Sequence, residues 1–394
     1  MSNINIGLFG FGVVGEGIYK VLNKKPQLAA HIKKVVIKQK DKERNAPSTL
    51  FTTHSDTVLE DPSIDLVVEL IDDAKAALDI SLKAMNNKKS VISANKKMVA
   101  EHLELLKETA EKNNVSFLYE AAVCGSVPVI RNLEEYYDND LIDSISGIIN
   151  GSTNYILTQM AKNNWTYRHA VQEAQKLGFA ESDPSLDVGG WDARDKLKIL
   201  AVHAFGKSLA DDQIFVQGIE NLATEDFKYA KEKKYVIKLI AECRLDQKGH
   251  LIEASVCPSF LPRFHPLRLT DNEYNALLIG GELSDQQFLY GKGAGRYPTS
   301  SAVLSDISAY RYNYKYAYKK SISKVRESMK ASSLYYIRSN EAVIKDISKE
   351  LKAYEKHYSN DSAYCIVRAD QEGLRTLKKD YTFSLIKVPD VNLY

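Results

Sequence analysis

A glycine-rich turn near the start of the chain limits the fold more than any other feature. Ile4, Ile6 and Leu8 alternate as in a buried strand, and a helix-like pattern follows the turn. Between them the chain reads Gly10-Phe11-Gly12-Val13-Val14-Gly15. A turn with this glycine spacing between a strand and a helix brings backbone N–H groups against the pyrophosphate of a dinucleotide. The turn therefore predicts a dinucleotide-binding βαβ unit, with a glycine-rich turn that binds nothing as the alternative.

Further strand and helix patterns predict three domains. Strand-like segments at 35–37, 65–70 and 90–93 alternate with helical ones at 75–86 and 101–112, which indicates a doubly wound parallel sheet of the α/β class. Longer helices then mix with strands, as in an α+β domain, and a small module alternates strands and helices from about Leu334. We expect the boundaries 1–130 with 296–325 returning, 131–295, and 331–394.

Composition narrows the classes of partner. The 394 residues are 44% hydrophobic and 26% charged, and 53 basic residues nearly balance 51 acidic ones. Such a soluble composition offers no net field for nucleic acid or an anionic membrane, and no apolar run reaches the roughly 20 residues of a membrane span. Four scattered cysteines without paired or metal-type spacing, and an N-terminus without a signal pattern, predict a reducing cytoplasm and no export.

Alternating tyrosines from Tyr310 to Tyr318 suggest two structures. They fit a stacking platform for single-stranded nucleic acid, or a half-buried strand or helix end. The second interpretation is favoured because no other feature indicates nucleic-acid binding.

The second predicted strand bears on the choice of cofactor. An NAD site usually carries an acidic residue about 20 residues after the turn, but this strand ends in Lys38-Gln39-Lys40. Lys38 and Lys40 suit a ribose 2′-phosphate, which favours NADP over NAD. Two solvated lysines are the alternative.

Three segments carry candidate chemistry. Hydride transfer to a carbonyl needs a cation or acid beside the oxygen, and Lys96 follows a strand at the edge where parallel sheets bind ligands. Asp192 and Lys196 share a helix face and form either a site or a surface ion pair. The acidic loop before them offers Glu181 and Asp187 to a substrate ammonium.

A second glycine-rich turn, which includes Gly293 and Gly295, either closes over the cofactor or is a simple turn.

Taken in order over about residues 4–310, these segments resemble the homoserine dehydrogenase family. The family's motifs are similar to Gly10–Gly17, Ser93–Lys96, Gly147–Leu157, Gly178–Leu197 and Gly291–Val303. The resemblance implies NAD(P)-dependent, reversible reduction of L-aspartate 4-semialdehyde to L-homoserine, in the branch of amino-acid biosynthesis that leads to threonine, methionine and isoleucine. It also implies that 131–295 is a catalytic and dimerisation domain, and that the protein is a homodimer.

The same resemblance assigns residues. Lys96 and Lys196 become catalytic, with Asp192 binding the substrate hydroxyl or orienting Lys196. The substrate-binding residues become Glu181, Asp187, Gly151 and Ser152. The cofactor-binding residues become Gly10, Phe11, Gly12, Val13, Val14, Gly15, Lys38, Lys40, Ser93, Asn95, Lys96, Gly293 and Gly295. A monovalent metal ion, typically sodium, is expected at Glu120, Val123, Gly125 and Val127, through a glutamate and backbone carbonyls.

The chain departs from the family pattern at several points. Asp72 and Asp73 stand where glycines near the cofactor are usual, and Cys124 replaces a small residue in the metal loop. The module at 331–394 resembles an ACT domain but lacks its Pro-Gly turn, and the pattern shows fewer strands than βαββαβ. We therefore predict a degenerate ACT-like module.

Two other functions use part of these features. An aspartate-semialdehyde dehydrogenase requires Cys124 as its nucleophile, together with phosphate, and has no use for Lys96 and Lys196. A nicotinamide-sensing regulatory protein keeps the glycine turn but needs no pairing of Asp192 with Lys196. Catalytic turnover without phosphate distinguishes homoserine dehydrogenase from both.

Overall fold

The computed structural model describes residues 3–39, 42–138, 141–246, 251–322, 326–328, 332–358 and 362–389. The chain forms two compact units. The first unit comprises Met1–Asp138 and Gly291–Lys319, and the second comprises Asn139–Tyr290 and Lys320–Tyr394. The segment predicted as a separate C-terminal module therefore belongs to the second unit, whose sheet it shares.

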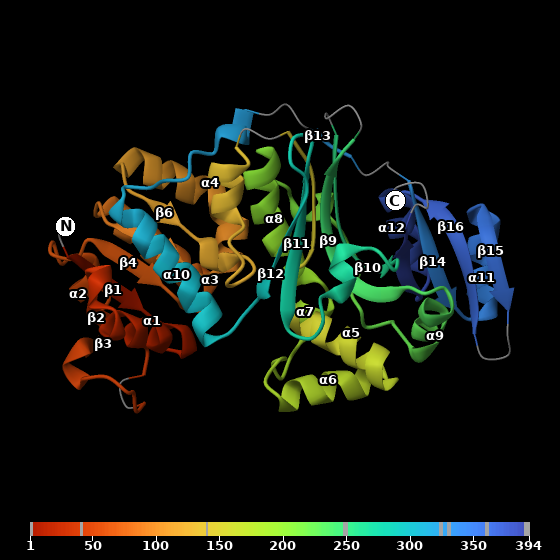
Figure 1. Ribbon diagram of the computed structural model, residues 1–394, viewed down its shortest axis with the longest axis horizontal. Coiled ribbons are helices and arrows are strands. Elements are labelled where there is room, and N and C mark those ends of the chain that lie inside the picture. Colours follow the sequence, from red (N-terminus) through yellow and green to blue (C-terminus); the bar gives the residue numbers. More distant parts are fainter. Residues whose placement is uncertain are drawn as a thin grey trace. The chain divides into compact units, whose positions relative to one another are not determined.

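The first unit contains a parallel sheet of six strands in the order β3-β2-β1-β4-β5-β6 (Figure 1). All adjacent strands are parallel, and this order is that of dinucleotide-binding folds, which confirms the predicted fold class. The carboxyl ends of β1 and β4 adjoin at the point where the strand order reverses, the usual place for a ligand. The strands are β1 (Ile4–Phe9), β2 (Ala30–Val36), β3 (Phe51–Thr52), β4 (Leu66–Glu69), β5 (Ser90–Ser93) and β6 (Phe117–Leu118).

Helices of the first unit include one from the returning part of the chain. That helix, α10, packs on α1, and an added Cβ at Gly17 would lie 2.5 Å from Ser300 Oγ. Ser300 Oγ also donates to Val14 O at 3.1 Å, and Arg296 pairs with Glu16 at 3.1 Å. These contacts hold residues 296–311 against the helix that follows the glycine turn. The helices are α1 (Val13–Lys24), α2 (Asp56–Leu59), α3 (Ala74–Asn86), α4 (Lys96–Asn113) and α10 (Arg296–Arg311).

The second unit contains a larger mixed sheet. Its strands follow the order β12-β11-β7-β9-β10-β17-β14-β16-β15, and β8 and β13 pair with β10. β9 and β10 form a long antiparallel ladder from Val236↔Leu261 to Leu245↔Ile252. The strands are β7 (Ile142–Ile148), β8 (Phe215–Val216), β9 (Val236–Leu245), β10 (Leu251–Leu261), β11 (Tyr274–Gly281), β12 (Asp285–Lys292), β13 (Arg326–Glu327), β14 (Ser333–Ser339), β15 (Ala353–Tyr358), β16 (Ala363–Ala369) and β17 (Ser384–Val388).

Five α-helices precede the C-terminal segment in the described part of the second unit. α8 is buried on nearly all sides, so its charged residues lie inside the unit. α5 and α8 both pack against β9, and Asn150, the N-cap of α5, donates to Asp192 in the first turn of α8. The helices are α5 (Gly151–Asn163), α6 (Tyr167–Lys176), α7 (Ser185–Val188), α8 (Trp191–Phe205) and α9 (Thr224–Glu232).

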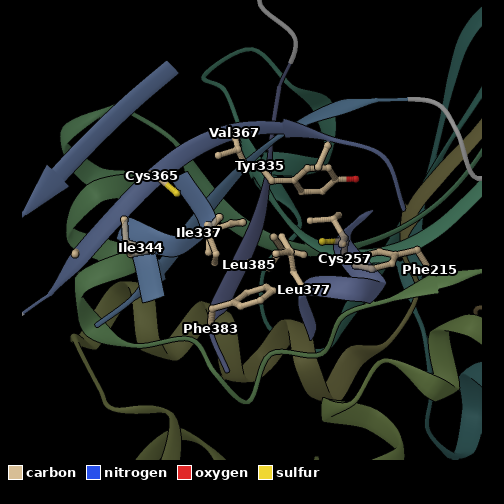
Figure 2. Packing of buried hydrophobic residues seen from close by; sticks show 14 residues of the cluster. Phe215, Cys257, Tyr335, Ile337, Ile344, Cys365, Val367, Leu377, Phe383 and Leu385 are labelled. Atoms are coloured by element: carbon tan, nitrogen blue, oxygen red, sulfur yellow. The ribbon is translucent and has the colours of Figure 1, made fainter. Parts of the chain in front are cut away.

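The C-terminal segment corrects one expectation. It runs β14, α11 (Glu341–Glu350), β15, β16, α12 (Gln371–Asp380) and β17, a complete βαββαβ pattern with strand order β17-β14-β16-β15. The expectation of fewer strands was wrong because β15 is a polar, mostly exposed edge strand without the apolar alternation of a core strand. Ile337, Cys365 and Leu385 form a continuous core with the two helices (Figure 2).

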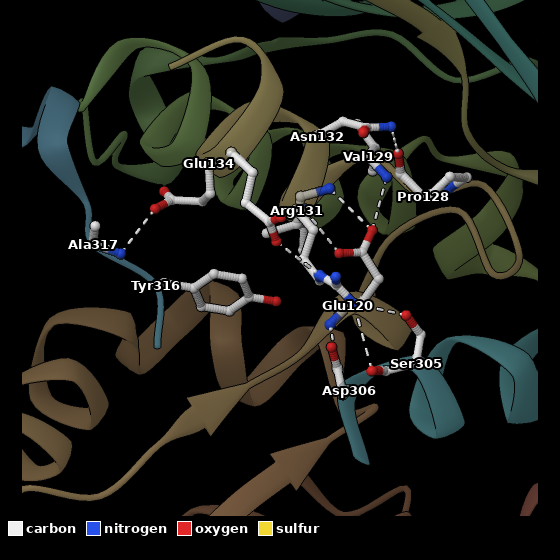
Figure 3. Close-up of polar contacts among 12 residues, drawn as sticks. Glu120, Pro128, Val129, Arg131, Asn132, Glu134, Ser305, Asp306, Tyr316 and Ala317 are labelled. Carbon is white, nitrogen blue, oxygen red and sulfur yellow. Dashed lines mark hydrogen bonds and ion pairs between the residues drawn. The ribbon is translucent and has the colours of Figure 1, made fainter. Parts of the chain in front are cut away.

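The alternating tyrosines mark the end of α10 and the segment that follows it. Tyr316 and Tyr318 are buried, and the Tyr318 hydroxyl lies 2.8 Å from that of Tyr119. The Glu134 carboxylate accepts the backbone N–H groups of Ala317 and Tyr318, at 3.0 Å each, and Figure 3 shows the first of these bonds. The half-buried helix end is therefore the correct interpretation of this pattern.

Candidate active site

Two glycines of the glycine turn are required by the fold, and a third, Gly12, is not. An added Cβ at Gly15 would lie 2.6 Å from Gly10 O, and Gly10 itself has φ 92. At Gly12, by contrast, an added Cβ would meet no atom within 4 Å. Gly12 is the N-cap of α1, and because it has no side chain, no side-chain hydrogen bond caps the start of this helix. The open space beside it, at the positive end of a helix, suits a phosphate group.

A basic cavity of about 580 Å³ adjoins this turn. The Arg44 guanidinium lies 5.4 Å from the centre of the Phe51 ring, which contacts the ring of Phe11. Sequence reasoning missed Arg44 because it considered only the end of β2. Lys38 is exposed, and Lys40 lies outside the described residues. The cavity is lined by Phe11, Gly12, Val13, Glu16, Lys42, Glu43, Arg44, Asn45 and Arg296.

Ser93 and Asn95 organise the ends of β4 and β5 through buried side chains. Ser93 Oγ donates to Glu69 Oε2 at 2.5 Å, and Ile71 N donates to Glu69 Oε1 at 2.6 Å. Burial raises the pKa of Glu69 to about 7, although these hydrogen bonds oppose the rise. Asn95 accepts the N–H of Met98 at 2.9 Å and so caps α4.

Lys96 is the first residue of α4 and is half-buried at the carboxyl edge of the sheet. Its position is fixed by Asn95, the N-cap residue that immediately precedes it. Lys96 therefore lies beside the end of β5, where the sequence placed it. The side chains of Ser93 and Asn95 are buried and hold the loop between β5 and α4.

One of the unusual aspartates has a local structural role. Asp73 Oδ1 accepts the N–H of Ala76 at 3.0 Å and caps α3. That backbone hydrogen bond lowers the pKa of Asp73. The carboxylate of Asp73 therefore serves as a helix cap.

The second glycine turn packs against the predicted metal loop. An added Cβ at Gly125, which has φ 53, would lie 2.4 Å from Gly293 O, and Ser126 N donates to Lys292 O at 3.1 Å. Gly295 has φ 116 and precedes the first residue of α10. Gly293 thus supports the metal loop, and Gly295 starts the helix that contacts α1.

Glu120 holds the opposite side of the metal loop (Figure 3). Its carboxylate accepts the N–H groups of Val129, Ile130 and Arg131 at 2.7, 3.0 and 2.9 Å. Its own N–H donates to Asp306 Oδ2 at 2.9 Å, and burial raises the pKa values of both carboxyl groups. Because three donors occupy the Glu120 side chain, a cation at this loop would depend mainly on backbone carbonyl oxygens.

The loop geometry is compatible with such a site. Cys124 and Gly125 have φ 57 and 53, so the chain turns sharply between Val123 and Val127. Among the described residues no three His, Cys, Asp or Glu side chains are grouped to hold a metal. A carbonyl site for a hard alkali ion is the kind that this loop can provide.

A buried ion pair forms the centre of the second unit's site. Lys196 Nζ lies 2.7 Å from Asp192 Oδ2 and donates to Ile149 O at 2.8 Å. Lys196 is 9% exposed and Asp192 is 4% exposed. The interpretation of this pair as a surface ion pair is therefore wrong, because α8 lies inside the unit. A paired ammonium held away from water is suited to act on a bound carbonyl.

Asn150 extends the pair into a network and was missed by sequence reasoning. Its Nδ2 donates to Asp187 Oδ1 at 2.6 Å and to Asp192 Oδ2 at 2.8 Å, while its Oδ1 accepts Thr153 N at 2.8 Å and caps α5. The segment containing Asn150 had been singled out, but an N-cap role alone would explain an asparagine there. Its link between two aspartates depends on contacts distant in sequence.

The other predicted substrate residues lie around the same helix start. Gly151 begins α5, and an added Cβ there would lie 2.8 Å from Glu273 O. Ser152 Oγ donates to Phe179 O at 2.6 Å, which ties α5 to the acidic loop. Glu181 is exposed on that loop, and its backbone carbonyl accepts Gln175 Nε2 at 3.0 Å. The second unit thus brings Gly151, Ser152, Asp187 and Asp192 together around one helix terminus.

Lys96 belongs to the first unit and Lys196 to the second. Within the described ranges, no helix has the length and apolar content needed to cross a bilayer. The first unit carries a dinucleotide-type turn, and the second carries a buried lysine–aspartate pair beside an acidic loop.

Comparison with known proteins relates both units to one family. The family models described as "Homoserine dehydrogenase, NAD binding domain" and "Homoserine dehydrogenase" match residues 10–120 and 128–308. Homoserine dehydrogenase of Bacillus subtilis is 38% identical over 322 residues, 79% of this chain and 74% of that protein. A crystal structure of a homoserine dehydrogenase from Thiobacillus denitrificans has a TM-score of 0.87 at 29% identity and covers 99% of each chain. A hyperthermophilic archaeal homoserine dehydrogenase solved with NADPH has a TM-score of 0.68 at 25% identity, over 80% of this chain and 99% of that one. The chain belongs to the homoserine dehydrogenase family of oxidoreductases.

Proposed function

We propose that Lys196 is the acid–base group for the reversible reduction of L-aspartate 4-semialdehyde to L-homoserine. The observation that carries this proposal is the buried contact of 2.7 Å between Lys196 Nζ and Asp192 Oδ2. A bound nicotinamide supplies hydride to the carbonyl carbon. As negative charge develops on the oxygen, the Lys196 ammonium stabilises it and donates a proton, which yields the alcohol. Asp192 positions the ammonium through the 2.7 Å contact.

The acidic loop would bind the substrate's ammonium group. Asp187 and Asp192 contribute two negative charges against one positive charge from Lys196, so this network carries an excess of one negative charge. Such an excess favours a cationic group, and Glu181 adds a further carboxylate on the same loop. The substrate carboxylate would meet the start of α5 at Gly151 and Ser152, where the helix dipole favours an anion.

Lys96 would act on the substrate from the nucleotide-binding unit. It is the first residue of α4 at the carboxyl edge of the parallel sheet, where a nicotinamide and its substrate meet in folds of this class. A second ammonium would help to polarise the carbonyl oxygen. This role predicts that both lysines are needed for turnover and that neither is needed for folding of the glycine turn.

NADPH is the cofactor that the basic cavity favours. Lys42, Arg44 and Arg296 line it beside Gly12 together with Glu16 and Glu43, so the lining has one positive charge in excess, and Lys38 is exposed at the end of β2. The Arg44 guanidinium donates to Lys42 O at 2.6 Å and to Gln39 O at 2.7 Å, and these hydrogen bonds hold its positive charge at the cavity, where it would attract a ribose 2′-phosphate. The archaeal relative was solved in complex with NADPH, which agrees with this preference. Lys40 and the glycines Gly293 and Gly295 remain proposed cofactor contacts.

A sodium ion would stabilise the loop from Glu120 to Val127. Backbone carbonyl oxygens of Val123, Gly125 and Val127 are the proposed ligands, together with Glu120. The ion would order the segment that Gly293 contacts and would take no part in proton transfer. Activity in sodium-free buffer, with and without added sodium, tests this assignment.

We also propose that the protein is a cytoplasmic homodimer. The edge strand β12 exposes Phe288 and Tyr290, at 45% and 50%, which is apolar surface that a second copy can cover. All four cysteines are buried thiols, as expected in a reducing compartment. Light scattering in solution tests the dimer.

The decisive experiment measures initial rates of NADPH and NADH oxidation with L-aspartate semialdehyde in phosphate-free buffer. Rapid oxidation, faster with NADPH at low concentration, is the expected result. Lys198→Ala is the matched control for Lys196→Ala because Lys198 lies on the same helix but pairs with Asp211 at 2.8 Å. Phosphate-dependent reduction of NADP+ by the semialdehyde in place of NADPH oxidation, or equal rates in both variants, would contradict the proposal.

A further inference from the structure

Glu69 is a buried carboxyl group at the carboxyl end of β4 that the proposed reaction does not use. It is 0% exposed, and the nearby charge that acts on it belongs to Asp72, another carboxylate. A buried charge without a cation beside it is destabilising unless hydrogen bonds compensate. Both oxygens of Glu69 accept such bonds, from Ser93 Oγ at 2.5 Å and from Ile71 N at 2.6 Å. Glu69 therefore acts as a double acceptor that holds two neighbouring segments.

These two bonds belong to a closed ring of four hydrogen bonds. Ser93 Oγ, which donates to Glu69, also accepts Asn95 N at 3.0 Å. Asn95 Nδ2 donates to Ile71 O at 3.0 Å, and Ile71 N closes the ring by donating to Glu69. The ring joins the ends of β4 and β5 to Asn95, the N-cap of α4.

The ring determines where Lys96 begins. The backbone pairing of β4 with β5 ends at Glu69↔Ser93, and one further bond runs from Ala94 N to Glu69 O at 3.2 Å. Past that bond, side chains of the ring connect the strand ends to Asn95. Because Lys96 directly follows Asn95, its backbone is fixed by the same ring. A misplacement of about 1 Å at a reacting group can lower a rate about 100-fold, so this connection bears on turnover.

The ring needs an acceptor at both ends of the side chain at position 69. Ser93 has one hydroxyl proton, which it donates to Glu69 while its oxygen accepts the N–H of Asn95. A glutamine in place of Glu69 would have one acceptor end and one donor end. It could accept from Ile71 N or from Ser93 Oγ, but not from both. Glu69→Gln therefore opens the ring with almost no change in side-chain shape.

We propose that Glu69 is a positioning residue for Lys96, which it holds through Ser93 and Asn95. Because Glu69 is fully buried, it contacts neither substrate nor cofactor and acts by fixing the start of α4. The inference rests on the proposed function, in which Lys96 polarises the carbonyl oxygen. It adds to that function a buried residue that keeps the Lys96 ammonium in register with the reacting atoms.

The test is a double-mutant cycle of Glu69→Gln and Lys96→Met. Initial rates are measured at about pH 8, because burial raises the pKa of Glu69 to about 7 and its carboxyl group is then ionised. We expect Glu69→Gln to lower kcat by about 10- to 100-fold and to change the KM values for NADPH and semialdehyde by less than about threefold. In the Lys96→Met background the same substitution should change kcat by less than about twofold, because the group that it positions is absent.

Two further measurements assign the effect to the start of α4. Hydrogen–deuterium exchange of residues 93–99 should be faster in Glu69→Gln than in the parent. Glu101→Gln changes an exposed carboxylate on the same helix and should match the parent in both exchange and rate. Ser93→Ala opens the ring at its next member, and its kcat at saturating NADPH should fall by a similar factor. That variant keeps the test valid should Glu69→Gln not fold.

Three results would overturn the proposal. They are faster exchange in Glu69→Gln without loss of kcat, the same loss of kcat with and without the Lys96 ammonium, and a change confined to KM. Near-normal turnover of Lys96→Met would refute the proposed role of Lys96 itself, and with it this inference. Slow turnover of Lys96→Met with normal turnover of Glu69→Gln would refute the positioning role alone.

Discussion

Replacing Lys196 by methionine should reduce both turnover and stability, by separable mechanisms. The substitution keeps the apolar stem but removes the ammonium that lies 2.7 Å from Asp192 Oδ2. Asp192 is 4% exposed, so its carboxylate would be left buried with Asn150 as a donor, at a cost of about 3–5 kcal/mol in the free energy of unfolding. Loss of the proton donor should lower kcat by about 10²–10⁴-fold.

A double variant separates the two effects. Lys196→Met combined with Asp192→Asn removes both charges, so most of the lost stability should return while kcat stays low. Denaturant unfolding measures stability, initial rates measure kcat, and fluorescence titration with NADPH checks that the first unit still binds its cofactor. Lys198→Met, on the same helix but paired with Asp211, should stay within about threefold of the parent rate. Near-normal turnover in Lys196→Met, or recovery of turnover in the double variant, would refute the assignment.

Three further predictions concern the first unit. Gly12→Ala should leave the free energy of unfolding nearly unchanged but weaken NADPH binding. Gly15→Ala should lower the free energy of unfolding, because its Cβ would lie 2.6 Å from Gly10 O. Chemical denaturation and cofactor titration compare the two variants. Arg44→Ala should raise the KM for NADPH by about tenfold and change that for NADH much less, in steady-state kinetics. Glu69 keeps its proton in the folded state up to about pH 7, against a usual pKa of 4.5, so stability should fall as pH rises through this window, by up to about 1.4 kcal/mol per unit. Glu69→Gln should flatten that slope in unfolding curves measured at several pH values; an unchanged slope would contradict the assigned pKa.

The parallel sheet was predictable where its strands carry strong apolar patterns. β4 and β5 lie within one residue of their predicted limits. β3 and β6 contain two residues each, which is too short for any period to be visible. The start of α4 was placed five residues late because Asn95 was interpreted as part of a loop, although its side chain is the N-cap.

The candidate site was predictable as a set of residues but not as a network. Lys196 and Asp192 have the spacing of an ordinary exposed pair, and only the packing of α8 on the sheet makes them buried. Asn150 connects them to Asp187 across 37 positions in the chain, a distance that no local pattern reveals. Arg44 lies in a loop and contacts the ring of Phe51, which is distant enough in the chain that no local pattern reveals the contact. Local patterns identify side chains, and tertiary contacts determine their environment.

The two units differ in how their proposed ligand sites are built: one lacks side chains, and the other holds charged side chains in fixed positions. At the glycine turn the chain omits side chains, so the space beside Gly12 and the N–H groups of α1 are open to a phosphate, and the nearby charges come from the lining of the adjoining cavity. In the second unit the charges are present in advance, and Asn150 and Asp192 hold the Lys196 ammonium in place before the substrate arrives. An enzyme that stabilises developing charge with fixed groups avoids reorganising them during the reaction. The proposed lysine site therefore requires rigidity from α5 and α8, and substitutions that loosen the Asn150 network should lower kcat more than they raise KM.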